Sequence, residues 1–219
     1  MKIRFVARKS LQDFKEGYKS EGEQLLLFGF EGLGAVSYEK ELKGESVCFE
    51  DTALLSKEAC AIVVSGCVTE MGGIKRKSAV VAERGKLLGV SDVTYTIDGH
   101  GNPGGALRVY DTKLGRMGVL VAEDLFFSDT TQALSLCGSD FLVCIYGKVE
   151  DSTPQILTRS YAYLYGLPIF FCGIGYSMIA DMGGSLYLAS PKTPLLVDFD
   201  GRKEYHVIQT RRRGRCGST

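Results

Sequence analysis

Residues 109–127 read VYDTKLGRMGVLVAEDLFF and carry the strongest structural pattern in the chain. Two apolar segments, residues 107–110 and 117–122, flank the turn sequence KLGR at residues 113–116, and this pattern predicts a β-hairpin. The second arm ends at Ala122, and two acidic residues follow it directly. Ligands of open α/β sheets bind at the carboxyl ends of strands, so this turn is the first candidate site.

Short apolar runs on both sides of the hairpin predict a sheet that is covered on its faces. Runs of four to seven apolar residues are typical of buried strands, and segments with apolar residues at helical spacing are typical of surface helices. The expected strands are residues 3–7, 25–30, 61–67, 78–83, 85–90, 141–145, 168–173, 185–188 and 195–199, and the expected helices are residues 10–19, 51–58, 129–137 and 152–165. Because helices alternate with strands and the hairpin adds antiparallel pairing, the sequence predicts an α/β protein with a mixed sheet.

The charge balance argues against a general nucleic-acid binder and the hydropathy argues against a membrane span. The 219 residues include 26 Lys+Arg and 26 Asp+Glu, whereas nucleic-acid affinity depends on excess positive charge. No apolar run approaches the ~18 residues that a membrane-spanning helix needs. One domain over residues 1–210 is expected, followed by a basic tail at residues 211–219, whose RRRGR run we interpret as a solvated or partner-crossing arm.

The seven cysteines predict a reducing, cytoplasmic setting. Their number is odd, no two of them form a Cys-x-x-Cys pair, and most lie in apolar runs, where a free cysteine acts as a small hydrophobe. We therefore expect the cysteines to be reduced and mostly buried, and we expect neither a metal nor another cofactor.

Three strand ends carry residues that could do chemistry. Glu31 follows the run LLLFGF, Lys86 follows the strand expected at residues 78–83, and Ala122 ends the hairpin arm. A carboxylate, an ammonium and a strand-end residue that converge could supply a general base, an oxyanion stabiliser and a nucleophile. Spacing alone leaves open the alternative that Glu31 and Lys86 are solvated residues in turns.

Six ordered segments resemble the nitrilase, or carbon–nitrogen hydrolase, superfamily over most of the chain. The hairpin and its following turn, residues 109–127, are the most specific match. The other segments are GEQLLLFGFEG at 22–32, ERGKLLG at 83–89, SDFLV at 139–143, the helix end with Gly-Leu-Pro at 159–168, and the Gly-Ser and Ala-Ser-Pro motifs at 184–191.

The resemblance implies hydrolysis of an amide or nitrile through a cysteine thioester. Carried over by position, Glu31 would be the general base, Lys86 would stabilise the oxyanion, and Ala122 occupies the position of the nucleophilic cysteine. A methyl group cannot attack a carbon atom, so this is the central departure from the family. In addition, Gly29-Phe30-Glu31 replaces Phe-Pro-Glu, a match that allows a slip of one residue, and residues 87–107 lack the family's second glutamate.

The resemblance also implies a fold and an assembly. It implies a four-layer α-β-β-α sandwich with two mixed sheets and a homodimer formed through a helical layer. Around the site, Glu123, Phe127 and Tyr146 are expected to contact a small amide, nitrile or carboxylate ligand.

Three functions remain open at this point. The chain could be a hydrolase scaffold that is inactive because Ala122 replaces the cysteine, either naturally or through a substitution made to trap substrate. It could be an active hydrolase with another nucleophile, such as Cys144 at the end of the next strand, although the apolar run around that thiol favours a buried and inert cysteine. It could also be a binding or regulatory pseudoenzyme that keeps the pocket for a small molecule.

Overall fold

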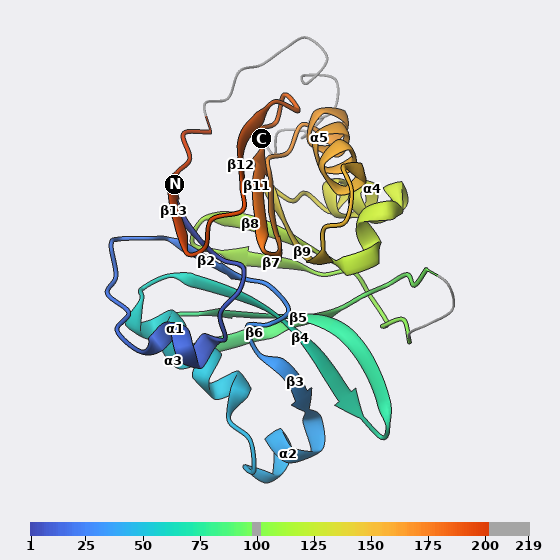
Figure 1. The fold of residues 1–219 in the computed structure, drawn as a ribbon. Helices are drawn as coiled ribbons and strands as arrows, with labels where there is room; N and C mark the ends of the chain where they lie inside the picture. The colour runs from blue at the N-terminus through green and yellow to red at the C-terminus, as the bar shows by residue number, and fades with distance from the viewer. Residues whose placement is uncertain (98–101, 202–219) are drawn as a thin grey trace, which may run out of the picture.

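The computed structural model describes residues 1–97 and 102–201, which form two β-sheets (Figure 1). In the first sheet the strand order is β13-β1-β2-β4-β5-β6, with β3 also paired to β4. Strands β1, β2, β3 and β4 run parallel, and β5, β6 and β13 pair antiparallel with their neighbours. The bounds are β1 (Lys2–Val6), β2 (Leu25–Phe28), β3 (Gly34–Ser37), β4 (Ile62–Met71), β5 (Ile74–Glu83), β6 (Lys86–Asp92) and β13 (Leu195–Asp198).

The second sheet has the order β12-β11-β10-β9-β8-β7. Strands β8, β9 and β10 are parallel, so their carboxyl ends meet at one edge, and the outer strands are antiparallel. The bounds are β7 (Val109–Thr112), β8 (Gly115–Val121), β9 (Phe141–Lys148), β10 (Ile169–Ile174), β11 (Tyr176–Ala180) and β12 (Leu186–Ser190).

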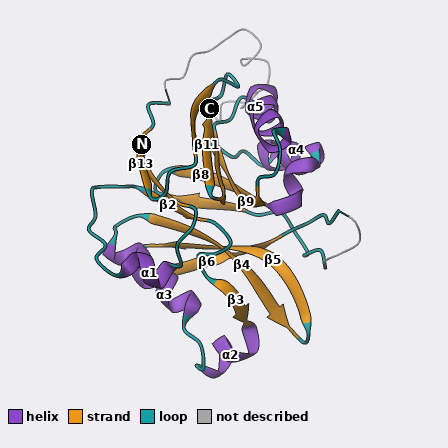
Figure 2. Ribbon diagram, viewed as in Figure 1, coloured by secondary structure: helices purple, strands orange, loops and turns teal. Residues whose placement is uncertain are grey.

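The two sheets pack face to face, and helices cover both outer faces (Figure 2). Alternate residues of each strand point between the sheets, such as Phe5 and Val64 from the first sheet and Val119 from the second. Helices α1 (Leu11–Lys15) and α3 (Cys48–Glu58) cover the first sheet, and α4 (Ser128–Leu136) and α5 (Thr153–Tyr165) cover the second. The expected four-layer α-β-β-α sandwich is confirmed.

Several elements differ from the sequence prediction. Strand β3, strand β11 and helix α2 (Tyr38–Lys43) were not predicted, and α2 buries no residue, so it has no apolar pattern to detect. Helix α1 is shorter than the expected 10–19, because its C-cap Glu16 is extended and Gly17 has a φ of +79°. The expected basic tail at 211–219 lies outside the described residues.

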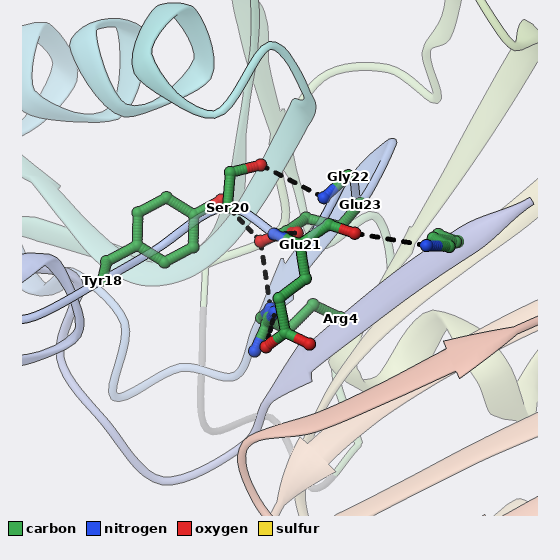
Figure 3. A network of polar contacts seen from close by, with 7 residues as sticks. Arg4, Tyr18, Ser20, Glu21, Gly22 and Glu23 are labelled. Carbon is green, nitrogen blue, oxygen red and sulfur yellow. Dashed lines mark hydrogen bonds and ion pairs between the residues drawn. The ribbon is translucent and has the colours of Figure 1, made fainter.

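A buried ion-pair network ties the loop before β2 to β1 (Figure 3). The Arg4 Nε donates to Glu23 Oε1 at 3.0 Å and its Nη2 donates to Glu21 Oε1 at 2.9 Å. The Tyr18 hydroxyl also donates to Glu23, and the Glu21 backbone N–H donates to the other Glu23 oxygen at 2.8 Å. The carboxylate of Glu23 is therefore fully partnered although it is buried.

Candidate active site

The turn after β8 is the centre of the candidate site. Val121, the last residue of β8, pairs with Ile145 of β9. Ala122 follows with a φ of +49° and begins the short 3-10 helix η1 (Ala122–Phe126). Left-handed backbone costs a non-glycine residue about 1 kcal/mol, so this turn, residues 121–124, which we call the elbow, is strained. The side chain held there is a methyl group, and Ala122 is only 3% exposed.

Glu123 links the elbow to the opposite sheet. Its Oε1 accepts a hydrogen bond and ion pair from the Nζ of Lys77 on β5. Its Oε2 is buried and has no hydrogen-bond donor within the described part of the chain. The Glu123 side chain is 22% exposed and that of Lys77 is 46% exposed, so the pair lies at the surface rim of the elbow. Lys77 was not predicted as a site residue, because nothing in the sequence marks a contact across 46 positions.

Asp124 makes a second link between the sheets. Its carboxylate accepts backbone N–H bonds from Thr94 at 2.8 Å and Tyr95 at 3.0 Å, just beyond the end of β6, and a longer one from Val121 at 3.4 Å. The side chain is buried. Burial raises the pKa of Asp124 to about 6, although the hydrogen bonds from Tyr95, Thr94 and Val121 oppose the shift.

Aromatic rings surround the start of α4. Phe127 stacks on Tyr95 with ring centroids 4.3 Å apart, and the Tyr95 hydroxyl donates to Asp129 at 2.6 Å. Tyr146 of β9 is half-buried against Phe126, and burial raises its pKa to about 12. Of the three residues expected to contact a ligand, Glu123 lies within η1, Phe127 follows η1 directly, and Tyr146 contacts Phe126 at the end of η1.

The turn after β2 reaches the same edge of the sandwich as the elbow. A Cβ on Gly66 would lie 2.7 Å from Ile145 Cγ2 and 2.9 Å from the Phe30 backbone, so Phe30 lies close to the residue that pairs with Val121. Phe30 packs against the inter-sheet core, whereas Glu31 is exposed. The side chain that this turn directs toward the core is therefore that of Phe30 and not that of Glu31. This agrees with a match to the family's Phe-Pro-Glu that is shifted by one residue.

Lys86 lies at the opposite end of the first sheet. It pairs with Glu83 across the two-residue turn Arg84-Gly85, whose φ values of +53° and +78° are those of a tight hairpin. Lys77 and Glu83 are both on β5, and at about 3.3 Å per residue they lie roughly 20 Å apart. The structure does not bring Lys86 to the elbow, which corrects the expected oxyanion role of Lys86. Within the described part of the chain, the ammonium group that contacts the elbow belongs to Lys77.

Comparison with solved structures identifies the architecture. No protein-family model and no curated protein matches the chain. Saccharomyces cerevisiae Nit3, a member of branch 10 of the nitrilase superfamily, superposes with a TM-score of 0.74 at 14% identity, over 100% of this chain and 95% of that one. An amidase from Nesterenkonia sp. gives 0.74 at 18% identity, over 97% and 93%. The chain has the nitrilase-superfamily fold. A carbon–nitrogen hydrolase from Helicobacter pylori G27 also matches, with a TM-score of 0.71 at 15% identity, over 89% and 86%.

Within this nitrilase-type fold, Cys144 does not replace the missing thiol. It lies in the core cluster beneath α4 and α5, whereas its neighbours Val143 and Ile145 on β9 point between the sheets. Complete burial raises the pKa of Cys144 well above its usual value, and the Asp124 carboxylate adds to the shift. Since the thiolate is the nucleophilic form, Cys144 is an inert core residue, which agrees with the second of the two alternatives that the sequence left open for it.

The cysteines of the described residues are unpaired, and half of them are buried. Six cysteines are unpaired in the described residues, but only Cys67, Cys144 and Cys172 are buried, so the expectation of mostly buried thiols is wrong. Residues 1–97 and 102–201 contain no group of three or more His, Cys, Asp or Glu side chains that could hold a metal ion. Over the same residues, every helix is too short or too polar to cross a membrane.

The raised pKa of Asp124 gives a pH-dependent stability. The folded state binds the Asp124 proton more tightly than the unfolded chain, whose aspartates titrate near pH 4. This contribution to stability is complete below about pH 4 and is lost as the pH rises through 6. Between pH 7.5 and pH 5 we expect the chain to gain about 1 kcal/mol of unfolding free energy relative to Asp124→Asn, measured by urea denaturation. Equal pH dependence in the two proteins would contradict the assignment.

Proposed function

We propose that this chain is a non-catalytic protein on a carbon–nitrogen hydrolase scaffold, which binds a small molecule at the elbow without hydrolysing it. The observation that carries the proposal is the presence of Ala122 at the strained turn. Without a nucleophile there, no covalent intermediate can form, and the reaction loses the two-step route that makes amide cleavage fast.

The positions of the other two expected catalytic residues support the same proposal. Lys86 is roughly 20 Å along the sheet from Lys77, and Glu31 is exposed beyond Phe30. When a protein loses its catalytic activity naturally, selection no longer keeps any of the three catalytic residues in place. A cysteine replaced only to trap substrate would leave its base and its cation in place.

Ala122→Cys tests this proposal directly. We expect neither the chain nor Ala122→Cys to release ammonia from propionamide or propionitrile above about 10⁻³ s⁻¹, well below a typical enzyme turnover of 1–10³ s⁻¹. The reason is that the new thiol would lack an inward-facing carboxylate base and the predicted cation. Iodoacetamide labelling followed by mass spectrometry would verify that the thiol is present in folded protein.

Two results of the activity assay would contradict the proposal. Turnover of several per second by Ala122→Cys would mean that the site is intact and that Ala122 only interrupts it. Hydrolysis by the unchanged chain that survives Cys144→Ala would also contradict a non-catalytic role.

We further propose that the chain forms a homodimer through α4 and α5 and resides in the cytoplasm. Apolar side chains on these two helices are exposed, including Leu136, which is 80% exposed, Ile156 and Leu164. The unpaired cysteines support a reducing compartment.

Leu136→Glu should therefore shift sedimentation from dimer to monomer. Leu42→Glu is the matched control, because Leu42 is 82% exposed but lies on α2, beside the other sheet. If both variants sediment as the unchanged chain does, α4 is not part of a dimer interface.

A further inference from the structure

We propose that Cys48 is a modification site, at which a small disulfide that carries amino-acid groups, such as cystine, forms a mixed disulfide with the protein. Two features of the molecule support this site: a cavity that the thiol lines, and two charges in the cavity wall that have no ionic partner. The site is separate from the elbow, and its occupation does not depend on the proposed function.

The cavity has a volume of about 480 Å³ and lies beside β3 and the start of α3. This volume is within the range of about 300–1,000 Å³ that is usual for small-molecule sites. Helix α2 and strand β3 lie on the side of the first sheet away from the second sheet (Figure 1). The wall residue Val36 packs with Cys67 and Val80 on that outer side, whereas Ala122 belongs to the core between the sheets. The first sheet therefore separates the cavity from the elbow.

The Cys48 thiol lies in the wall of this cavity and is half-buried. Its Sγ lies 3.4 Å from the Oγ of Ser46, another wall residue. Cys48 is the first residue of α3, and the Glu41 carboxylate accepts the backbone N–H groups of Cys48 at 2.9 Å and Phe49 at 3.1 Å. Because a carboxylate already occupies this helix N-terminus, any selectivity at Cys48 comes from the cavity and not from a thiol activated by the helix.

Two charged side chains of the wall have no ionic partner. The acidic wall residues Asp51 and Glu70 are each paired with a lysine, at 3.0 Å and 4.0 Å. The Lys40 ammonium and the Glu45 carboxylate form no ion pair within residues 1–97 and 102–201, and the Glu45 N–H donates to the Lys40 carbonyl at 2.9 Å. A ligand with an α-carboxylate and an α-ammonium matches both charges, whereas a ligand with one charged group leaves the other wall charge unpaired.

The modification is a thiol–disulfide exchange. Cys48 loses its proton to solvent, and its thiolate attacks one sulfur atom of cystine. The S–S bond of cystine breaks, a new S–S bond joins Cys48 to one half of the molecule, and the other half leaves as a thiolate. Cys48 is oxidised and the departing half is reduced, so the disulfide is itself the oxidant. Because the exchange is reversible, the extent of modification follows the ratio of small disulfide to small thiol.

Three disulfides that differ in their charged groups test the site: cystine, cystamine, which lacks the carboxylates, and 3,3′-dithiodipropionate, which lacks the amines. The protein is equilibrated with each disulfide and its thiol, free thiols are blocked with N-ethylmaleimide, and the peptides are analysed by mass spectrometry. Cys60 and Cys137 are exposed and report the exchange of an ordinary surface thiol in the same sample. With cystine, the exchange constant of Cys48 should exceed that of Cys60 about five-fold or more, because each exposed ion pair contributes a factor of about two to five. Cystamine and dithiodipropionate should each lose one of these factors.

Substitutions in the wall assign each charge. Lys40→Met should lower the Cys48 preference for cystine to the level seen with cystamine, and Glu45→Gln should lower it to the level seen with dithiodipropionate. Lys43→Met is the matched control, because Lys43 is an exposed residue of α2, as Lys40 is, but does not line the cavity. It should leave the preference unchanged.

Three results would overturn the site. If Cys48 shows the same exchange constant relative to Cys60 with all three disulfides, the cavity wall does not select amino-acid groups. If Lys43→Met reduces the preference as much as Lys40→Met does, the effect is one of general surface charge. If oxidation gives a disulfide between Cys48 and Cys67, which pack in the same apolar cluster, in place of the mixed disulfide, the cavity does not hold the ligand.

Discussion

Gly66→Ala is expected to lower the unfolding free energy by about 3 kcal/mol or to prevent folding. The new Cβ would lie 2.7 Å from Ile145 Cγ2 and 2.9 Å from both the N and the Cα of Phe30. Ile145 belongs to the inter-sheet core and the Phe30 contact is backbone, so neither neighbour can move without displacing a strand or turn. Urea denaturation monitored by circular dichroism would give the value.

Gly147→Ala is the control for this result. Gly147 lies on β9, two residues beyond Ile145, and a Cβ there would meet nothing within 4 Å. We expect its unfolding free energy to stay within about 0.5 kcal/mol of that of the unchanged chain. Equal stabilities for Gly66→Ala and Gly147→Ala would mean that the two sheets do not approach closely at this edge.

Glu23→Gln is expected to cost about 3 kcal/mol, through the buried network shown in Figure 3. The substitution keeps the shape of the side chain but leaves the buried Arg4 guanidinium with Glu21 as its charged partner. Glu21→Gln is the matched variant, because Glu21 contacts the same arginine from the surface, and it should cost less than about 1 kcal/mol. Chemical denaturation at pH 7 measures both, and similar losses would show that Arg4 does not depend on Glu23.

The same carboxylate has a pH dependence opposite in sign to that of Asp124. Burial alone would raise the pKa of Glu23, but the hydrogen bonds from Tyr18, from the backbone and from Arg4 outweigh it and lower the pKa. The stability that Glu23 contributes is therefore present above the pKa of an unfolded glutamate, near 4.3, and is lost as the pH falls through the lower folded value. In Glu23→Gln this loss in acid should be absent.

Much of the fold could be predicted from sequence, because its elements carry local signals. The hairpin of β7 and β8 was marked by its KLGR turn, and α5 was marked by Pro154 at its start and by Gly166, which ends it in the left-handed conformation with a φ of +61°. Elements without such signals were missed, namely α2, which has no buried face, and the short strand β3.

The candidate site was predicted only in part, because it depends on the direction of each strand and on contacts between residues that are far apart in the sequence. Ala122 was placed correctly at the end of β8, since a strand followed by acidic residues is a local pattern. Lys86 was placed at the wrong end of the sheet, although the sequence held a signal for its position. The two-residue Arg-Gly turn puts Lys86 beside the last residue of β5. Because β5 is antiparallel to β4, the end of β5 lies at the start of β4 and not at its carboxyl end. The contact of Lys77 with Glu123 had no such signal.

The two carboxylates of the elbow connect the second sheet to two neighbouring strands of the first sheet. Glu123 holds β5 through Lys77, and Asp124, the next residue, holds the backbone just beyond β6 through Thr94 and Tyr95. Any ligand that rotates this turn must pull on both strands at once, because consecutive residues cannot move independently. Binding of a ligand at this turn would therefore be felt as a shift of the β5–β6 edge of the molecule.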